Sequence, residues 1–228
     1  KQGLWCKVSS SHGRPAAASV SARSIPIPDT ISSFLTSPRK MNTPTSLPVR
    51  TGGQLLIDAL KVHGVDKVFG VPGESYLASL DAFYDVRDRI EFVICRQEGG
   101  AANMAEAYGK LTGRPGICFV TRGPGATNAS IGIHTAFQDS TPLILFIGQI
   151  DNEVAEREAF QEIDFRRMFG QMTKWVAQID RPERVPELVS HAFHLAVSGR
   201  PGPVVLALPE DMQTASARVA DTARYQRV

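Results

Sequence analysis

The stretch GICFVTRGPGATNASIGIHTAFQDSTPLILFIG, residues 116–148, decides the fold. It opens with an apolar run over 116–121, passes through a glycine-rich turn and continues with helical spacing over 126–137. Residues 142–148 are again wholly apolar, which is typical of a strand covered on both faces. A strand, a helix and a second strand in this order predict a right-handed βαβ unit in a parallel sheet.

The same alternation continues on both sides of this stretch. Apolar residues at helical spacing mark 52–63, 76–84, 98–111 and 183–198, and short apolar runs mark strands at 67–72, 90–95 and 203–208. Residues 149–182 show no clear period and are expected to be irregular. The sequence therefore predicts an α/β fold, a doubly wound parallel sheet with helices on both faces.

The charge of the chain is unevenly distributed. The 228 residues carry a net charge of +2, but residues 1–50 contain seven basic side chains and only one acidic one, Asp29. The rest of the chain has a net charge of −4. A basic nucleic-acid-binding surface is therefore not expected on the folded part. No run approaches the roughly 18 apolar residues of a membrane-spanning helix, so no membrane partner is expected either.

Residues 1–49 are rich in Ser, Pro, Ala and Arg and are predicted to be a disordered basic extension. Arg-rich, Ser-rich and acid-poor composition is also typical of organellar transit peptides. The favoured interpretation is a non-native extension over 1–40, with Met41 as the start, because the chain begins at Lys1. This interpretation predicts a cytoplasmic protein, and a genuine transit peptide would make it organellar.

The cysteines and histidines do not indicate a metal site. Cys6 lies in the extension, while Cys95 and Cys118 lie in apolar runs without metal-ligand spacing, which is typical of buried thiols in an intracellular protein. His191 and His194 are three residues apart on a predicted helix but have no third ligand. We therefore expect no metal ligands in this chain.

Four turns follow predicted strands, at 71–74, 96–100, 121–128 and 148–150. Ligands of doubly wound sheets bind at this edge. Gly123-x-Gly125 resembles a dinucleotide-binding turn only weakly, because Asn128 replaces the third glycine and Pro124 lacks a backbone N–H. A tight turn that lets a planar ligand or a partner chain approach the backbone is the better interpretation.

Glu98 opens a predicted helix whose next residues are Gly99, Gly100, Ala101 and Ala102. A carboxylate in this position can simply stabilise the helix dipole. Alternatively, the small neighbours clear space, and an apolar surround favours the protonated carboxyl group. Such a group could hydrogen-bond a ring nitrogen.

Seven motifs together resemble a known family. They are Val71-Pro-Gly-Glu74, Arg96-Gln-Glu-Gly-Gly-Ala101, Thr112-Gly-Arg-Pro-Gly116, Arg122-Gly-Pro-Gly-Ala-Thr-Asn128, Asp139-Ser-Thr-Pro-Leu143, Gly148-Gln149 and Ala159-Phe-Gln-Glu162. In order and spacing they resemble the N-terminal pyrimidine-binding domain of thiamine-diphosphate enzymes, closest to the acetolactate synthase (acetohydroxyacid synthase) large subunit, over residues 50–213. The resemblance implies a cofactor, thiamine diphosphate, and a small 2-keto acid substrate such as pyruvate.

The resemblance also implies roles for single residues. Glu98 would be the catalytic glutamate that hydrogen-bonds the aminopyrimidine N1′ and favours the imino tautomer, which removes the thiazolium C2 proton before the keto acid is attacked and CO2 leaves. The other implied cofactor-binding residues are Pro72, Gly73, Gly123, Pro124, Gly125 and Asn128, the last four near a subunit interface. Gln149, Phe160 and Gln161 would lie on the substrate side, although Phe160 could equally be a core aromatic residue. Lys174 also matches a family position, and a solvated lysine is its simpler interpretation.

Three departures from the family pattern leave the substrate open. The family usually has His-Glu-Gln-Gly where this chain has Gln97-Glu98-Gly99-Gly100, and Ser where it has Arg122. Glu210 stands where acetolactate synthases usually have a lysine at the channel entrance. Reversing a charge beside an anionic substrate alters selectivity.

In the family, a second domain with a Gly-Asp-Gly motif holds the diphosphate and its Mg2+, and this chain contains no Gly-Asp-Gly. We therefore expect residues 214–228 to be a linker to a missing central domain, and the chain to be a fragment or half of a split enzyme, inactive alone. The resemblance implies a homodimer or larger assembly with the cofactor at the interface, and leaves an FAD requirement open. Two alternatives remain: a related 2-keto-acid or oxalyl-CoA decarboxylase, and a noncatalytic assembly module that retains the fold.

Overall fold

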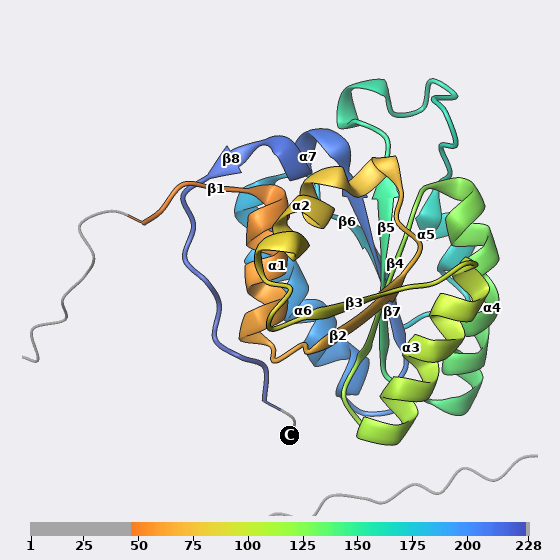
Figure 1. Cartoon of the computed structure of the whole chain (residues 1–228). Coiled ribbons are helices and arrows are strands. Elements are labelled where there is room, and N and C mark those ends of the chain that lie inside the picture. Colours follow the sequence, from red (N-terminus) through yellow and green to blue (C-terminus); the bar gives the residue numbers. More distant parts are fainter. Residues whose placement is uncertain (1–46, 227–228) are drawn as a thin grey trace, which may run out of the picture. The chain divides into compact units, whose positions relative to one another are not determined.

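The computed structural model describes residues 47–226 (Figure 1). The predictions about residues 1–46, including the extension and its start at Met41, lie outside the described residues. The helices are α1 (Gly52–Val62), α2 (Leu77–Asp85), α3 (Glu98–Thr112), α4 (Gly123–Asp139), α5 (Phe165–Phe169), α6 (Val185–Val197) and α7 (Glu210–Thr214). The strands are β1 (Arg50–Thr51), β2 (Lys67–Gly70), β3 (Glu91–Ile94), β4 (Gly116–Val120), β5 (Leu143–Gln149), β6 (Trp175–Gln178), β7 (Pro203–Pro209) and β8 (Ser216–Ala217).

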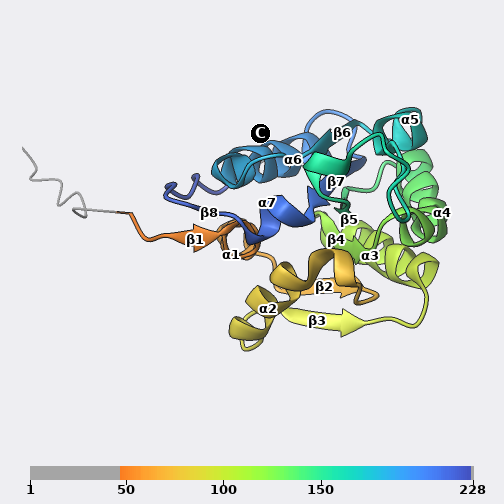
Figure 2. The ribbon, with the colours of Figure 1, turned by 90° about the horizontal axis from the view of Figure 1, so that it is seen from above.

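Six strands form one parallel sheet in the order β3-β2-β4-β5-β7-β6, and β1 pairs with β8 in a separate antiparallel ribbon. Helices α1, α2 and α6 lie on one face of the sheet, and α3, α4 and α5 lie on the other (Figures 1 and 2). The predicted α/β fold with a doubly wound parallel sheet is confirmed. Within residues 47–226, no helix has the length and apolar content needed to cross a membrane.

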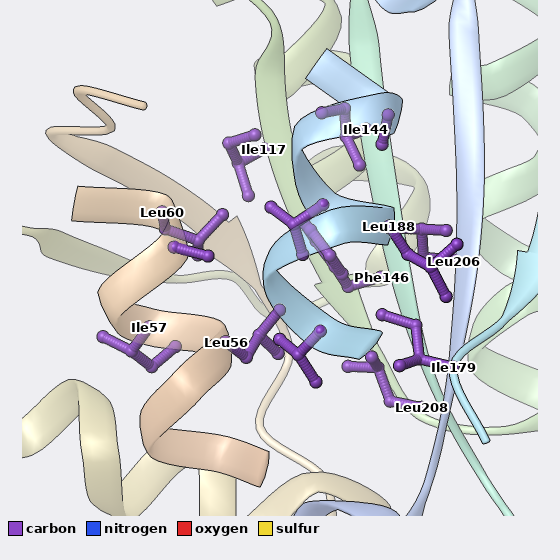
Figure 3. Close-up of a cluster of buried hydrophobic side chains, with 14 of the residues drawn as sticks. Leu56, Ile57, Leu60, Ile117, Ile144, Phe146, Ile179, Leu188, Leu206 and Leu208 are labelled. Carbon is purple, nitrogen blue, oxygen red and sulfur yellow. The ribbon is translucent and has the colours of Figure 1, made fainter. Parts of the chain in front are cut away.

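Alternate residues of the central strands enter two separate cores. Ile117 and Phe119 of β4 pack with α1 and α6, whereas Cys118 and Val120 pack with α3 and α4. Figure 3 shows part of the first core, where Leu56 and Leu60 of α1 face the side chains of the central strands. This two-sided burial is the reason that the central strands are apolar at every position. Cys95 and Cys118 are both buried, which confirms the prediction of buried thiols.

Two local predictions were wrong. Helix α4 begins at Gly123 and not near Ala126, because Pro124 fits the first turn of a helix, where its missing N–H costs nothing. The Gly-Pro-Gly segment is therefore helical and not a separate turn. The stretch expected to be irregular contains α5 and β6. Strand β6 is a four-residue edge strand in which only Ala177 is buried, and its apolar run of three residues is too short to reveal it.

Small residues bring α3 close to both the sheet and α4. A Cβ on Gly116 would lie 1.8 Å from the Ala105 carbonyl oxygen of α3, so this crossing requires glycine. A Cβ on Gly132 of α4 would lie 2.6 Å from the Ala102 Cβ. These contacts fix α3, which begins at Glu98, against both β4 and α4.

Beyond α7, the chain returns to the core. Strand β8 pairs Ala217 with Arg50, and Arg50 also donates hydrogen bonds to Asp221 and to the Val219 carbonyl oxygen. Tyr225 then packs against the first core. The boundaries of the domain and of the linker after residue 213 stay predictions.

Candidate functional site

The candidate site lies where the strand order reverses. The chain leaves β2 toward β3 on one side, while the later strands β4 and β5 are added on the other. The connections after β2 and β4 therefore diverge and leave a crevice at their carboxyl ends, which is the usual ligand site of such sheets. The turn at 71–74 and the short connection from β4 into the start of α4 border this point.

Glu98 is the first residue of α3 and is half-buried. The N-cap is provided by Gln97, whose side-chain oxygen accepts a hydrogen bond from the Gly100 N–H at 2.9 Å. Glu98 Oε2 accepts a hydrogen bond from Asn128 Nδ2 at 2.9 Å. No donor within residues 47–226 bonds to Glu98 Oε1, so one carboxylate oxygen is free to accept a hydrogen bond from a ligand.

The titratable groups that the charge of Glu98 influences carry no charge at neutral pH. Burial raises the pKa of both Tyr76 and Cys118, and the negative charge of Glu98 raises them further. Both groups therefore stay protonated. A Cβ on Gly125 would lie 3.6 Å from Glu98 Oε1, so this glycine keeps the space at that oxygen open.

The turns at this edge are in direct contact. A Cβ on Gly73 would lie 2.7 Å from the Thr121 Cβ, and the hydroxyls of Ser75 and Thr121 are 2.8 Å apart. A Cβ on Gly148, in β5, would lie 2.0 Å from Ser75 Oγ. The turn after β2 thus lies against Thr121 after β4 and against β5, which explains why positions 73 and 148 are glycine. Pro72 lies in the exposed part of the same turn.

An open groove of about 440 Å³ runs along the start of α4. Its lining includes four residues of the predicted site: Gly123, Pro124, Asn128 and Gln161. The Gly123 N–H donates to the Gln161 carbonyl oxygen at 2.9 Å, which holds the loop after β5 against α4. Gln161 has a φ of 63°, a left-handed conformation that is uncommon for a residue with a side chain.

Within residues 47–226, the other predicted substrate-side residues form no hydrogen bond with Glu98. Gln149 is buried at the end of β5, and its amide group bonds to the Ile163 carbonyl oxygen and to the Ile150 N–H, both at 3.0 Å. Phe160 is 69% exposed, so it is not a core aromatic residue. Its ring centre lies 5.9 Å from the Arg122 guanidinium carbon.

Arg122 and Glu210, two of the three departures from the family pattern, form an ion pair. The Arg122 side chain is 9% exposed, and its guanidinium donates hydrogen bonds to Glu210 and, at 2.9 Å, to Glu74. Sequence reasoning noted Arg122 and Glu210 separately and missed that they form one ion pair. Opposite charges after two strands of the same sheet were the available signal.

Lys174 lies away from the site. It precedes β6, at the opposite edge of the sheet, and its ammonium group donates to the Leu195 and Ser198 carbonyl oxygens at the end of α6. Burial lowers its pKa. Lys174 is therefore not a solvated lysine, and it does not belong to the candidate site around Glu98. In the described part of the chain, no group of His, Cys, Asp or Glu side chains is arranged to hold a metal ion.

This doubly wound domain therefore carries a half-buried carboxylate at its switch point, with one oxygen free and glycine beside it, an arrangement that can accept a hydrogen bond from a ligand. Residues 50–168 match the family model described as thiamine pyrophosphate enzyme, N-terminal TPP binding domain. The chain belongs to this family of thiamine-diphosphate-binding domains, which confirms the resemblance.

Curated relatives agree with this assignment. The chain is 40% identical over 174 residues to the acetolactate synthase catalytic subunit, mitochondrial, of Saccharomyces cerevisiae, an alignment that covers 76% of this chain and 25% of the relative. It is 42% identical over 162 residues to the probable acetolactate synthase large subunit of Methanocaldococcus jannaschii (71% and 27%). It is 40% identical over 165 residues to the acetolactate synthase isozyme 2 large subunit of Escherichia coli (72% and 30%). The chain thus spans less than a third of the length of these relatives.

The residues around Glu98 fit the cofactor that the family implies. A protonated ring nitrogen needs a carboxylate oxygen that is not already bonded, and Glu98 Oε1 meets this need. A flat ring also needs room beside the helix start, and a Cβ on Gly100 would meet no atom within 4 Å.

Proposed function

We propose that this domain binds the aminopyrimidine part of thiamine diphosphate in an acetolactate-synthase-like enzyme. The single observation that carries the proposal is the Glu98 carboxylate at the switch point, with Oε2 bonded to Asn128 and Oε1 free beside Gly125. The family of this chain and its relatives at about 40% identity support thiamine diphosphate as the cofactor.

When bound, thiamine diphosphate supplies a thiazolium ring that attacks the keto carbon and takes up the electrons released with CO2. The role of this chain would be proton transfer at the other ring of the cofactor, the aminopyrimidine. Glu98 Oε1 would share a proton with the ring nitrogen N1′ and so act as a general acid and base.

The rest of the site would come from elsewhere. We infer that a second domain holds the diphosphate through Mg2+, since relatives are more than three times as long as the aligned segment. We also infer that two copies assemble with the cofactor between them. The groove along α4 offers an uncovered surface for that contact. This chain alone is then inactive.

The reaction we propose is decarboxylation of pyruvate, or of a related 2-keto acid, followed by condensation with a second carbonyl compound. The experiment supplies the complete protein with thiamine diphosphate, Mg2+ and pyruvate and identifies the products. Acetolactate is the expected product. Acetaldehyde would instead identify a decarboxylase, and cofactor binding without turnover of any 2-keto acid would identify a noncatalytic module. Glu98→Gln is the control, and we expect it to abolish turnover.

A further inference from the structure

We infer that Asn128 positions the catalytic carboxylate, and that it does so by holding Glu98 Oε2 and leaving Oε1 to the ligand. The inference rests on the proposed function, because it assigns a role within the same site. Resemblance alone placed Asn128 among the cofactor-binding residues, whereas the structure gives its side-chain amide a partner inside the protein.

The first step is geometric. Asn128 Nδ2 lies 2.9 Å from Glu98 Oε2, the distance expected of a hydrogen bond to a charged acceptor. Because Oε2 is occupied, a ligand that seeks the Glu98 carboxylate meets Oε1, on the side that Gly125 keeps open. The bond therefore decides which oxygen faces the ligand.

The second step is the rigidity of the two helices that carry these residues. A Cβ on Gly99 of α3 would lie 3.1 Å from the Asn128 carbonyl oxygen of α4. One turn further on, Gly132 packs directly on Ala102. Helices held together by such small residues cannot separate without loss of packing, so Asn128 stays within reach of Glu98.

The third step is electrostatic. The titratable side chains whose pKa values respond to Glu98 are Tyr76, on the turn before α2, and Cys118 of β4, and both stay neutral. No cation within residues 47–226 forms an ion pair with Glu98. The amide of Asn128 is therefore the protein group that stabilises the charged carboxylate, since a hydrogen bond to the charged form favours it.

Two variants of Asn128 test the inference in the complete protein. Asn128→Ala removes the donor from an exposed helical position and is compatible with the helix. Asn128→Asp keeps the shape and places a second carboxylate 2.9 Å from the first. Ser130→Ala, on the same helix, is the matched control because its hydroxyl bonds to the Thr127 carbonyl oxygen and not to Glu98.

Three readouts distinguish positioning from direct binding. We expect kcat to fall about 10- to 100-fold in Asn128→Ala, the effect of one hydrogen bond to a charged group. The Kd of thiamine diphosphate with Mg2+, measured by calorimetry, should change less than about 5-fold. In Asn128→Asp, the acid limb of the kcat/KM profile should move to higher pH by at least about one unit, because two adjacent carboxylates do not ionise together.

Some results would overturn the inference. A wild-type kcat and pH profile in both variants would do so, and so would a large rise in Kd with kcat preserved, which identifies Asn128 as a direct ligand. The Glu98→Gln variant distinguishes failure of the Asn128 inference from failure of the proposed function. If Glu98→Gln is inactive and the Asn128 variants are normal, only the positioning role is wrong; if Glu98→Gln is fully active, the proposed function itself is wrong.

Discussion

His63, at the C-terminal end of α1, should make the stability of the domain depend on pH. The residue is 2% exposed, and its ring stacks on Phe193 with ring centres 4.5 Å apart. Its Nδ1 accepts a hydrogen bond from the Tyr225 N–H at 3.3 Å, whereas its Nε2 is buried without a partner in the described structure. A protonated ring would bury a charge that nothing nearby neutralises.

The magnitude follows from the pKa of His63. Burial, with a smaller contribution from the positive charge of Arg224, lowers it from 6.5 to about 4. A helix C-terminus favours a cation by at most about 2 kcal/mol, and here burial outweighs that effect. As pH falls below 6.5, the unfolded chain binds a proton that the folded domain does not. The free energy of unfolding should therefore fall by about 3 kcal/mol between pH 6.5 and 4, at 1.36 kcal/mol per unit.

Urea unfolding of the wild type and of His63→Phe, at half-unit steps from pH 7.5 to 4.5, measures this contribution. The variant keeps a ring against Phe193, cannot titrate, and loses the acceptor for Tyr225, which costs about 1 kcal/mol at pH 7.5. The wild type should then be the more stable protein at pH 7.5 and the less stable one at pH 4.5, with curves that cross between about pH 5 and 6. Parallel curves would refute the reasoning, because all other titrating groups are common to both proteins.

Two further predictions concern the edge of the sheet that holds the site. Arg122→Met should destabilise the domain by about 1–2 kcal/mol, less than for a fully buried pair because the Glu210 side chain is 35% exposed. A double-mutant cycle with Glu210→Gln should give a coupling of at least about 0.5 kcal/mol, and additive effects would show that the pair contributes nothing. Gly125→Ala should leave the free energy of unfolding within about 1 kcal/mol of wild type, since the helix preference of alanine offsets the tight contact of its Cβ, 3.1 Å from Thr121 Cγ2. It should nevertheless weaken thiamine diphosphate binding at Glu98 Oε1 at least about 10-fold by calorimetry, and unchanged affinity would contradict the proposed location.

Most of the fold could be predicted because the central strands are buried on both faces and therefore apolar throughout. Strands β4, β5 and β7 stand out in the sequence for this reason. Strand β6 and helix α5 do not, because the apolar run of a short, half-exposed edge strand covers only three residues, and a five-residue helix spans little more than one turn. The start of α4 was misplaced because a Gly-Pro-Gly segment is typical of turns, and proline in the first helical turn overrides that tendency.

The site could be predicted only as a set of residues at one edge of the sheet. Glu98 stood out because small residues follow it at a helix start. Its hydrogen bond to Asn128, 30 residues away, and the pairing of Arg122 with Glu210, 88 residues away, depend on side-chain rotamers and on how closely the elements pack. No local pattern in the sequence carries that information.

The central claim is that Glu98 activates bound thiamine diphosphate through the pyrimidine ring, and proton exchange at the cofactor tests it most directly. The measurement is the rate at which the thiazolium C2 proton exchanges for deuterium in the complete protein loaded with thiamine diphosphate and Mg2+, without substrate. We predict that Glu98→Gln slows this exchange by at least about 100-fold, the lower range of general acid–base catalysis, while the cofactor stays bound. Exchange at the wild-type rate in the loaded variant would contradict the account.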